Sequence, residues 1–282
     1  MQIKENAETL ANRLVAVMAN YEQCVVAFSA GVDSTVVAKA AALAMGKKAT
    51  AVTAVSPSLA SGELEEARNI AQLIGIRHQV IHTSEVSKPA YKKNSHDRCY
   101  HCKTELYDHL ANIAEAFPNC VVANGTNMDD LGDYRPGLVA AEEHHVRSPM
   151  VECEIKKEHV RAIAAFWKLP VWDKPAMPCL SSRIAYGVEV TPERLRMVDQ
   201  AEQVVRQHGF RELRVRYHDG DLARIEVAKD DIPRLTEETL RNEISTQLKA
   251  IGFQFVTIDS DGFRSGNLNT LIPIEMLQQN KT

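Results

Sequence analysis

The stretch of sequence that decides the fold is CVVAFSAGVDS, residues 24–34. Its first half, Cys24 to Phe28, is a short continuous apolar run, which is typical of a strand covered on both faces in a parallel sheet. Small and hydroxylated residues follow, and the alanine-rich segment 35–45 predicts a helix. A buried strand, a tight loop and a helix in this order indicate the beginning of a βα unit.

Outward from this stretch, strands and helices continue to alternate. The sequence predicts further strands at 49–55, 78–82 and 120–123, and further helices at 5–20, 63–73 and 158–168. This alternation favours an α/β fold with a doubly wound parallel sheet, in which ligands bind at the carboxyl ends of the strands.

The pattern changes beyond about residue 185. The predicted order there is helix 192–208, strands 211–217 and 222–227, helix 231–251 and strand 253–259. We therefore expect two domains, residues 1–185 with the parallel sheet and residues 186–282 as a smaller α+β domain.

The loop after the first strand, residues 29–34, has the chemistry of a phosphate site, and we call it the phosphate loop. Ser29 and Ser34 supply hydroxyl donors, Gly31 lets backbone N–H groups approach an anion, and the next helix adds positive potential at its N-terminus. The lysine of a Walker-type loop is absent. The plain alternative is a strand-to-helix turn capped by serines.

The phosphate loop resembles the Ser-Gly-Gly-x-Asp-Ser signature of the PP-loop ATP pyrophosphatases. The resemblance implies that ATP binds here with pyrophosphate as its leaving group, and that Asp33 lies near Mg²⁺ and the phosphates. Ala30 stands where that family has glycine, and we expect it to be tolerated only if its φ angle is negative.

A second polar loop, residues 124–127, follows the predicted strand 120–123 and should reach the same edge of the sheet. We expect Gly125 to touch the nucleotide there. The acidic residues just beyond, Asp129, Asp130 and Asp133, could hold Mg²⁺, although acidic loops are usually only solvated. Of the three we favour Asp130.

Three of the six cysteines lie in polar surroundings. Cys99 and Cys102 form a C-x-x-C pair, and Cys179 follows a proline-rich segment. Structural zinc would need four ligands and a second pair at similar spacing, which the sequence lacks. Three thiolates with one open position suit an iron–sulfur cluster or a reactive-sulfur centre.

Composition narrows the classes of function. Lys and Arg total 33 against 37 Asp and Glu, a net charge of −4, so a general attraction to nucleic acid is not expected. No segment has the roughly 18 uncharged apolar residues of a membrane span, and the polar start argues against export. We expect a cytoplasmic protein whose cysteines are thiols or ligands rather than disulfides.

Four further segments carry a closer resemblance: DYRPGL at 133–138, SPM at 148–150, WDKPA at 172–176 and PCLSSR at 178–183. Together they resemble the LarE family of PP-loop enzymes. The resemblance implies an ATP-dependent sulfur transferase that adenylates a carboxylate of pyridinium-3,5-biscarboxylic acid mononucleotide and replaces oxygen with sulfur, in nickel-pincer cofactor biosynthesis.

Family members differ in their sulfur source. Some sacrifice the sulfur of one cysteine, and others carry three cysteines placed like Cys99, Cys102 and Cys179. This chain is similar to the three-cysteine members, which implies a [4Fe-4S] cluster on those residues. A persulfide, or the Cys179 side chain itself, stays open as the source.

A nucleotide substrate brings a phosphate that guanidinium groups can bind. Arg214 and Arg216 alternate along a predicted strand and should share a face. The residues expected at this phosphate are Arg214, Arg216, Arg264, Ser182 and Arg183. The alternatives are a salt-bridged basic strand, perhaps involving Glu226, and a helix cap at Ser182.

Three other functions compete. A tRNA thiolase would need an extended basic surface, which the net charge of −4 does not favour. An amide-forming ligase would leave the three polar cysteines without a role, and a nucleotide sensor would use the same loop without turnover. We expect a small-molecule nucleotide substrate, no membrane partner, an unidentified sulfur donor and a homo-oligomer.

Overall fold

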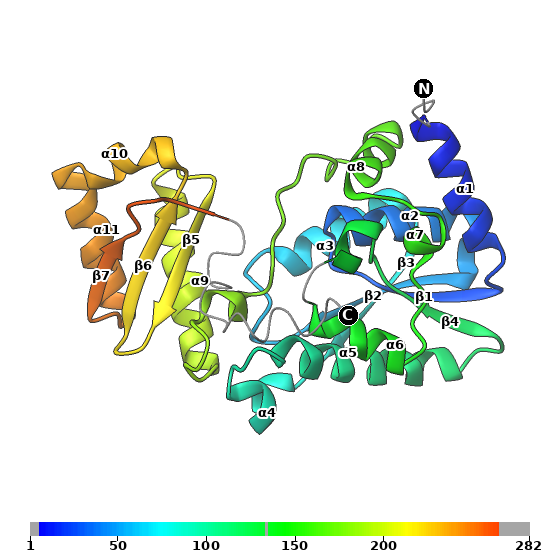
Figure 1. The fold of residues 1–282 in the computed structure, drawn as a ribbon, viewed down its shortest axis with the longest axis horizontal. Helices are drawn as coiled ribbons and strands as arrows, with labels where there is room; N and C mark the ends of the chain where they lie inside the picture. The colour runs from blue at the N-terminus through cyan, green and yellow to red at the C-terminus, as the bar shows by residue number, and fades with distance from the viewer. Residues whose placement is uncertain (1–5, 133–134, 265–282) are drawn as a thin grey trace. The chain divides into compact units, whose positions relative to one another are not determined.

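The structure is a computed structural model and describes residues 6–132 and 135–264 (Figure 1). The chain forms two compact units. Unit 1 runs to Ser56 and takes in Gly62–Glu85 and Cys99–Met177, and unit 2 takes Pro57–Ser61, Val86–Arg98 and the chain from Pro178 onward. The sequence placed one boundary at residue 185, whereas the second long segment begins at Pro178 and is joined by two short segments from earlier in the chain.

Unit 1 contains the expected parallel sheet. Its four strands, in the order β3-β2-β1-β4, are β1 Gln23–Ala27, β2 Ala49–Val55, β3 Arg77–His82 and β4 Cys120–Ala123. All three pairings are parallel, and Cys24 of the central β1 lies opposite Ala49 on one side and Val121 on the other. The predicted α/β fold is therefore confirmed.

Helices cover both faces of this sheet. Those of unit 1 are α1 Ala7–Ala19, α2 Val32–Met45, α3 Glu63–Ile74, α5 Arg98–Glu115 (from Cys99 onward), α6 Pro136–Glu143, α7 Pro149–Glu152 and α8 Lys157–Phe166. In Figure 1, α1, α2 and α8 lie on one side of the sheet, and α5 and α6 lie on the other.

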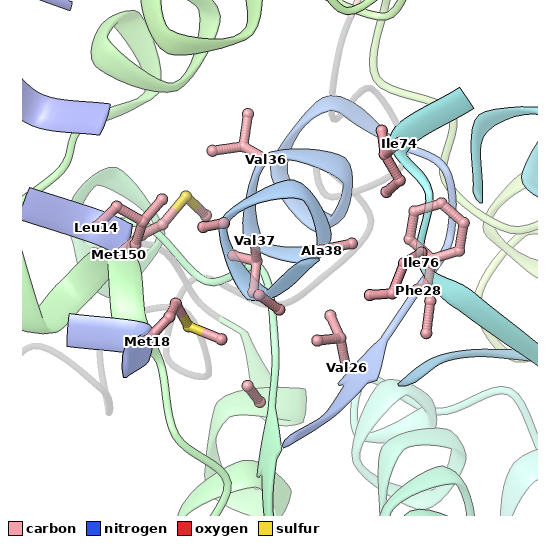
Figure 2. Close-up of a cluster of buried hydrophobic side chains, with 14 of the residues drawn as sticks. Leu14, Met18, Val26, Phe28, Val36, Val37, Ala38, Ile74, Ile76 and Met150 are labelled. Atoms are coloured by element: carbon pink, nitrogen blue, oxygen red, sulfur yellow. The ribbon is translucent and has the colours of Figure 1, made fainter. Parts of the chain in front are cut away.

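The core between α1, α2 and the sheet is drawn in Figure 2. Val37 of α2 lies between Leu14 of α1 and Val26 of β1, and all three are buried. A second cluster on the opposite face packs Tyr107 and its neighbours in α5 against the sheet. Burying a side chain of this size contributes about 1.5–3 kcal/mol, so the two clusters hold the strand ends, and the loops that leave them, in place.

Unit 2 is the smaller α+β assembly. Its sheet has the order β5-β6-β7, with strands β5 Leu213–His218, β6 Leu222–Val227 and β7 Phe255–Ile258. The β5–β6 pair is antiparallel and the β6–β7 pair is parallel. Its helices are α4 Pro89–Lys92, α9 Pro192–Gln207, α10 Ile232–Thr236 and α11 Glu238–Ile251.

Local signals set most helix ends. Thr191 caps α9 by accepting a hydrogen bond from the backbone of Arg194, with Pro192 in the first turn, as its sequence predicts. The prediction of one helix over 231–251 is wrong, because Glu237 is extended between α10 and α11. The Thr236 hydroxyl donates to the Pro233 carbonyl at 2.8 Å, a local bond that competes with helix continuation.

Candidate active site

The phosphate loop joins β1 to α2 and is closed by hydrogen bonds among its own residues. Ser29 N donates to Ser34 Oγ at 3.2 Å, and the two serine hydroxyl oxygens are 3.2 Å apart. Gly31 is the N-cap of α2, and Ser34 Oγ donates to its carbonyl at 3.2 Å. The helix begins at Val32 rather than at the predicted Thr35, so Asp33 and Ser34 lie in its first turn, where backbone N–H groups favour an anion.

Ala30 contradicts the expectation of a negative φ angle. Its φ is +56°, in the left-handed region, and its side chain is fully buried. The reversal from β1 into α2 requires this backbone conformation, and the short alanine side chain fits the core there. For a residue other than glycine this conformation costs about 1–2 kcal/mol, so the loop holds some backbone strain.

Asp33 is held by two side chains from distant parts of unit 1. Asn127 Nδ2 donates to Asp33 Oδ1 at 3.1 Å, and the ammonium group of Lys157 forms an ion pair with Asp33 Oδ2. Lys157 is the first residue of α8, and its backbone N–H donates to Asp129 at 2.9 Å. The carboxylate of Asp33 is thus fixed in direction but stays about a quarter exposed, at 27%.

The loop after β4 packs directly on the phosphate loop. A Cβ atom placed on Gly125 would lie 2.8 Å from Ser34 N and 3.0 Å from the Asp33 carbonyl carbon. Only glycine allows this approach without a shift of backbone. Asp130 belongs to the same loop, where it accepts from Asn127 N at 3.0 Å and pairs with Arg135 at 2.7 Å. Asp133 lies outside the described residues.

In unit 2, Arg183 organises the segment that carries Cys179. Its side chain is fully buried and pairs with Glu202 of α9 at 3.0 Å. The same guanidinium donates to the Cys179 carbonyl at 3.0 Å and to the Ser182 hydroxyl at 3.1 Å. Cys179 itself is exposed and precedes the short 3₁₀ helix Leu180–Arg183. Its thiol therefore sits on a backbone held by a buried ion pair.

Arg214 and Arg216 are both buried on β5. Arg216 pairs with Glu226 at 2.8 Å, the salt bridge that the sequence analysis gave as an alternative. Arg216 also donates to the Ser182 carbonyl at 3.1 Å. Arg214 donates to the Leu213 carbonyl at 2.6 Å and lies over the Phe263 ring. Burial, and then the charge of Arg183, lowers the pKa of Arg214 to about 10. An anion bound here would counter both effects.

The ion pair of Arg264 does not involve Arg183, Arg214 or Arg216. It is exposed and pairs with Asp261 at 2.8 Å. The neighbouring Ser265 and Gly266 lie outside the described residues.

Cys99 and Cys102 lie in the first turns of α5, one helical turn apart on one face. Cys99 is exposed and Cys102 is half-buried. They belong to unit 1, while Cys179 belongs to unit 2. Within residues 6–132 and 135–264, no group of three or more His, Cys, Asp or Glu side chains is arranged to hold a metal ion.

The other three thiols have raised pKa values. Burial raises the pKa of Cys24, and burial, more than the neighbouring Glu152, raises the pKa of Cys153 to about 11. Cys120 is half-buried, and burial also raises its pKa. None of the three has the accessible, low-pKa surroundings of a sulfur donor.

Comparison with known proteins identifies the family. A family model described as NAD synthase matches residues 3–109, which include β1, the phosphate loop and α2. The pyridinium-3,5-bisthiocarboxylic acid mononucleotide synthase of Lactiplantibacillus plantarum is 36% identical over 265 residues, covering 93% of this chain and 95% of the relative. This chain belongs to the LarE family.

Two further relatives have no described activity. An uncharacterised Synechocystis protein is 45% identical over 251 residues, covering 89% of this chain and 93% of the relative. An uncharacterised protein of Methanocaldococcus jannaschii is 29% identical over 244 residues, covering 86% and 92%. Family membership therefore extends over both units of the chain.

Sequence reasoning missed Lys157 and Asn127, although both touch Asp33 of this LarE-family phosphate loop. A signal for Lys157 was available. A lysine in the first turn of a helix opposes the helix dipole, and such a position favours an anionic partner. The sequence indicates Asn127 only as the last residue of the polar loop 124–127.

No helix in the part of the chain that the structure describes is both long and apolar enough to cross a membrane.

Proposed function

We propose that this protein is an ATP-dependent sulfur transferase that adenylates a carboxylate of pyridinium-3,5-biscarboxylic acid mononucleotide and then replaces oxygen with sulfur. The observation that carries the proposal is the 36% identity to a pyridinium-3,5-bisthiocarboxylic acid mononucleotide synthase over 93% of the chain. The closed phosphate loop and its fixed carboxylate support an ATP-using enzyme.

In the first step the phosphate loop binds the pyrophosphate of ATP. Ser29, Gly31 and Ser34 offer hydroxyl and backbone donors at the start of α2, and Gly125 keeps the neighbouring loop close. A carboxylate resists attack by nucleophiles, and adenylation supplies it with a good leaving group. The products of this step are the acyl-adenylate and pyrophosphate, with AMP released afterwards.

The residues around Asp33 fit a magnesium ion. Mg²⁺ prefers oxygen ligands, and the carboxylates of Asp33 and Asp130 are linked through Asn127, which donates to both. Bound there, Mg²⁺ would neutralise phosphate charge. Lys157 supplies positive charge to Asp33 from α8 and would be available to a phosphate oxygen when the carboxylate turns to the metal.

Three thiolates carry the second step. We assign Cys99, Cys102 and Cys179 to a [4Fe-4S] cluster, because soft sulfur ligands select such clusters and three ligands leave one iron open. When bound, the cluster supplies sulfur chemistry that the side chains alone lack. Cys99 and Cys179 are exposed and Cys102 is half-buried. Of the other three thiols, Cys24 and Cys153 are buried and Cys120 is half-buried.

The basic face of β5 is the proposed site for the substrate phosphate. The lowered pKa of Arg214 supports an anion at this place, and Arg216 and Ser182 are already joined by a hydrogen bond. Arg183 positions the Cys179 backbone from the same cluster. Arg264 would complete the site from beyond β7 by exchanging its exposed partner Asp261 for the phosphate.

Two other activities share the adenylation step. A tRNA thiolase would bind RNA through an extended basic surface, and an amide-forming ligase would use ammonia in place of sulfur. Neither accounts for both the nucleotide-synthase relative and the three polar cysteines. We further propose that the enzyme acts in the cytoplasm as a homo-oligomer.

The cysteine variants test the sulfur step. Cys179→Ala should lose sulfur transfer and keep measurable pyrophosphate release, because the phosphate loop and the thiols are different groups. Cys120→Ala, which removes a half-buried thiol of β4, is the matched control. Anaerobic purification should give about four iron atoms and sulfide in the wild type, and none in Cys99→Ala. Iron-free anaerobic protein that still transfers sulfur once would assign the donor to Cys179 itself.

A further inference from the structure

The segment Val86–Arg98 holds the backbone that carries Cys179. This segment leaves the sheet after β3 and belongs to unit 2 together with Pro178 and the chain that follows. The LarE activity assigns no role to it. Its contacts nevertheless concentrate on the few residues directly after the cysteine.

Two side chains of this segment form hydrogen bonds with Ser181, which lies two residues beyond Cys179. Arg98 Nη1 donates to the Ser181 carbonyl at 2.9 Å, and the Tyr91 hydroxyl lies 2.6 Å from Ser181 Oγ. All three side chains are buried, with Arg98 only 5% exposed. A hydrogen bond from a charged donor is stronger than one between neutral groups, and burial shields it from water.

Asn94 of the same segment forms hydrogen bonds with the backbone beyond Arg183. Its side-chain amide donates to the Ala185 carbonyl at 2.8 Å and to the Val188 carbonyl at 2.8 Å, while its Oδ1 accepts from Arg98. Asn94 is fully buried and has a φ of +55°. A buried amide in a left-handed conformation persists only where the surroundings require it, and here its bonds supply the reason.

Arg98 is also the residue that directly precedes Cys99 in the chain. Within unit 2, its side chain thus joins the backbone of the Cys179 segment to the last residue of the segment Val86–Arg98. Its guanidinium is planar and can donate to the Ser181 carbonyl and to Asn94 in one fixed geometry, which a lysine ammonium reproduces less well.

We propose that Arg98 is a positioning residue for sulfur transfer, which holds the Cys179 backbone relative to the segment that leads into Cys99. The proposal rests on the proposed function. A displaced thiol segment would leave the acyl-adenylate to water, which returns the free carboxylate and AMP. Pyrophosphate would still be released, but less of it would be matched by thiolated product.

The test is the ratio of pyrophosphate released to thiolated nucleotide formed, measured for the wild type and for Arg98→Gln. A displacement of about 1 Å can cost about a hundredfold in rate, so we expect the ratio to rise at least about tenfold in Arg98→Gln, with pyrophosphate release within about twofold of wild type. Arg98→Lys, which retains the charge, should give an intermediate ratio.

Arg194→Gln is the matched control. Arg194 also belongs to unit 2, donates to a backbone carbonyl, that of Glu189, at 2.7 Å, and lies over the Tyr217 ring, but its described contacts do not include residues 179–185. Its loss should leave the ratio unchanged. An unchanged ratio in Arg98→Gln, or an equal rise in Arg194→Gln, would overturn the proposal.

Hydrogen exchange separates this proposal from the proposed function. Leu180 N donates to the Ser58 carbonyl and Ile184 N to the Ser181 carbonyl, so these amides report the order of the segment without any substrate. We expect faster exchange over residues 179–188 in Arg98→Gln than in Arg194→Gln. Equal exchange would overturn the positioning role of Arg98, whereas a wild type that releases no pyrophosphate would instead refute the proposed function.

Discussion

Replacing Gly125 with alanine should damage the phosphate loop through one methyl group. The new Cβ would meet Ser34 N at 2.8 Å, the Asp33 carbonyl carbon at 3.0 Å and Asp33 Cβ at 3.1 Å. Two of these are backbone atoms at the start of α2, which no side-chain rotation can move. Reaching ordinary contact at 3.4 Å requires the two loops to separate by about 0.6 Å at the closest pair.

That separation has two expected costs. Overpacking of this kind destabilises a protein by about 1–3 kcal/mol. The displacement also moves the donors of Ser34 and the carboxylate of Asp33, and a shift of about 1 Å can cost about a hundredfold, so we expect pyrophosphate release to fall by about ten- to a hundredfold. Steady-state pyrophosphate release and thermal unfolding measure the two effects.

Gly132→Ala is the matched control on the same stretch of chain. A Cβ on Gly132 meets no atom of the described residues within 4 Å, so this variant should retain the wild-type rate and unfolding temperature. A Gly125→Ala protein with wild-type pyrophosphate release would refute the placement of residues 124–127 against a catalytic loop.

Three further predictions concern other groups. Asp33→Asn removes the carboxylate expected at Mg²⁺ and should lower pyrophosphate release at least about tenfold; an unchanged rate would make Asp33 only a helix-dipole residue. Arg214→Ala and Arg216→Ala should each raise the KM for the nucleotide substrate about tenfold, as loss of a charged hydrogen bond implies, while the KM for ATP stays constant; an equal effect on ATP would reverse the assignment. Burial, with a smaller contribution from Arg68, lowers the pKa of His78, whose ring bonds Thr53 at 2.8 Å, so the folded state resists protonation. The stability from neutral His78 is therefore present above about pH 6.5 and lost as the pH falls below it, and His78→Gln should flatten the unfolding free energy between about pH 7 and pH 5; the same slope in both proteins would show that other groups cause it.

The parallel sheet was predictable because its strands are continuous apolar runs. Residues 49–55 were predicted as a strand and form β2 as Ala49–Val55, since a run rich in alanine and valine between polar turns has one favourable environment. The loop after β1 was equally clear, because small residues and hydroxyls there follow a strand and open a helix.

Tertiary contacts account for what the sequence could not supply. Lys157 and Asp33 are 124 residues apart, and nothing local links them. The positive φ of Ala30 was missed because alanine carries no preference for it, and the surrounding fold imposes it. The short segments Pro57–Ser61 and Val86–Arg98 join unit 2 through bonds to residues 180–190, which no local pattern encodes.

The most direct test of the proposed reaction follows the fate of both substrates, ATP and the mononucleotide, in the same incubation. Anaerobically prepared protein is incubated with ATP labelled at the α-phosphate and with pyridinium-3,5-biscarboxylic acid mononucleotide. The nucleotide products are then separated, and their masses are measured by mass spectrometry. The account predicts that the label appears in AMP with matching pyrophosphate, and that one carboxylate oxygen of the mononucleotide is replaced by sulfur. Label in ADP, or AMP formed while the mononucleotide gains nitrogen from added ammonia instead of sulfur, would contradict it.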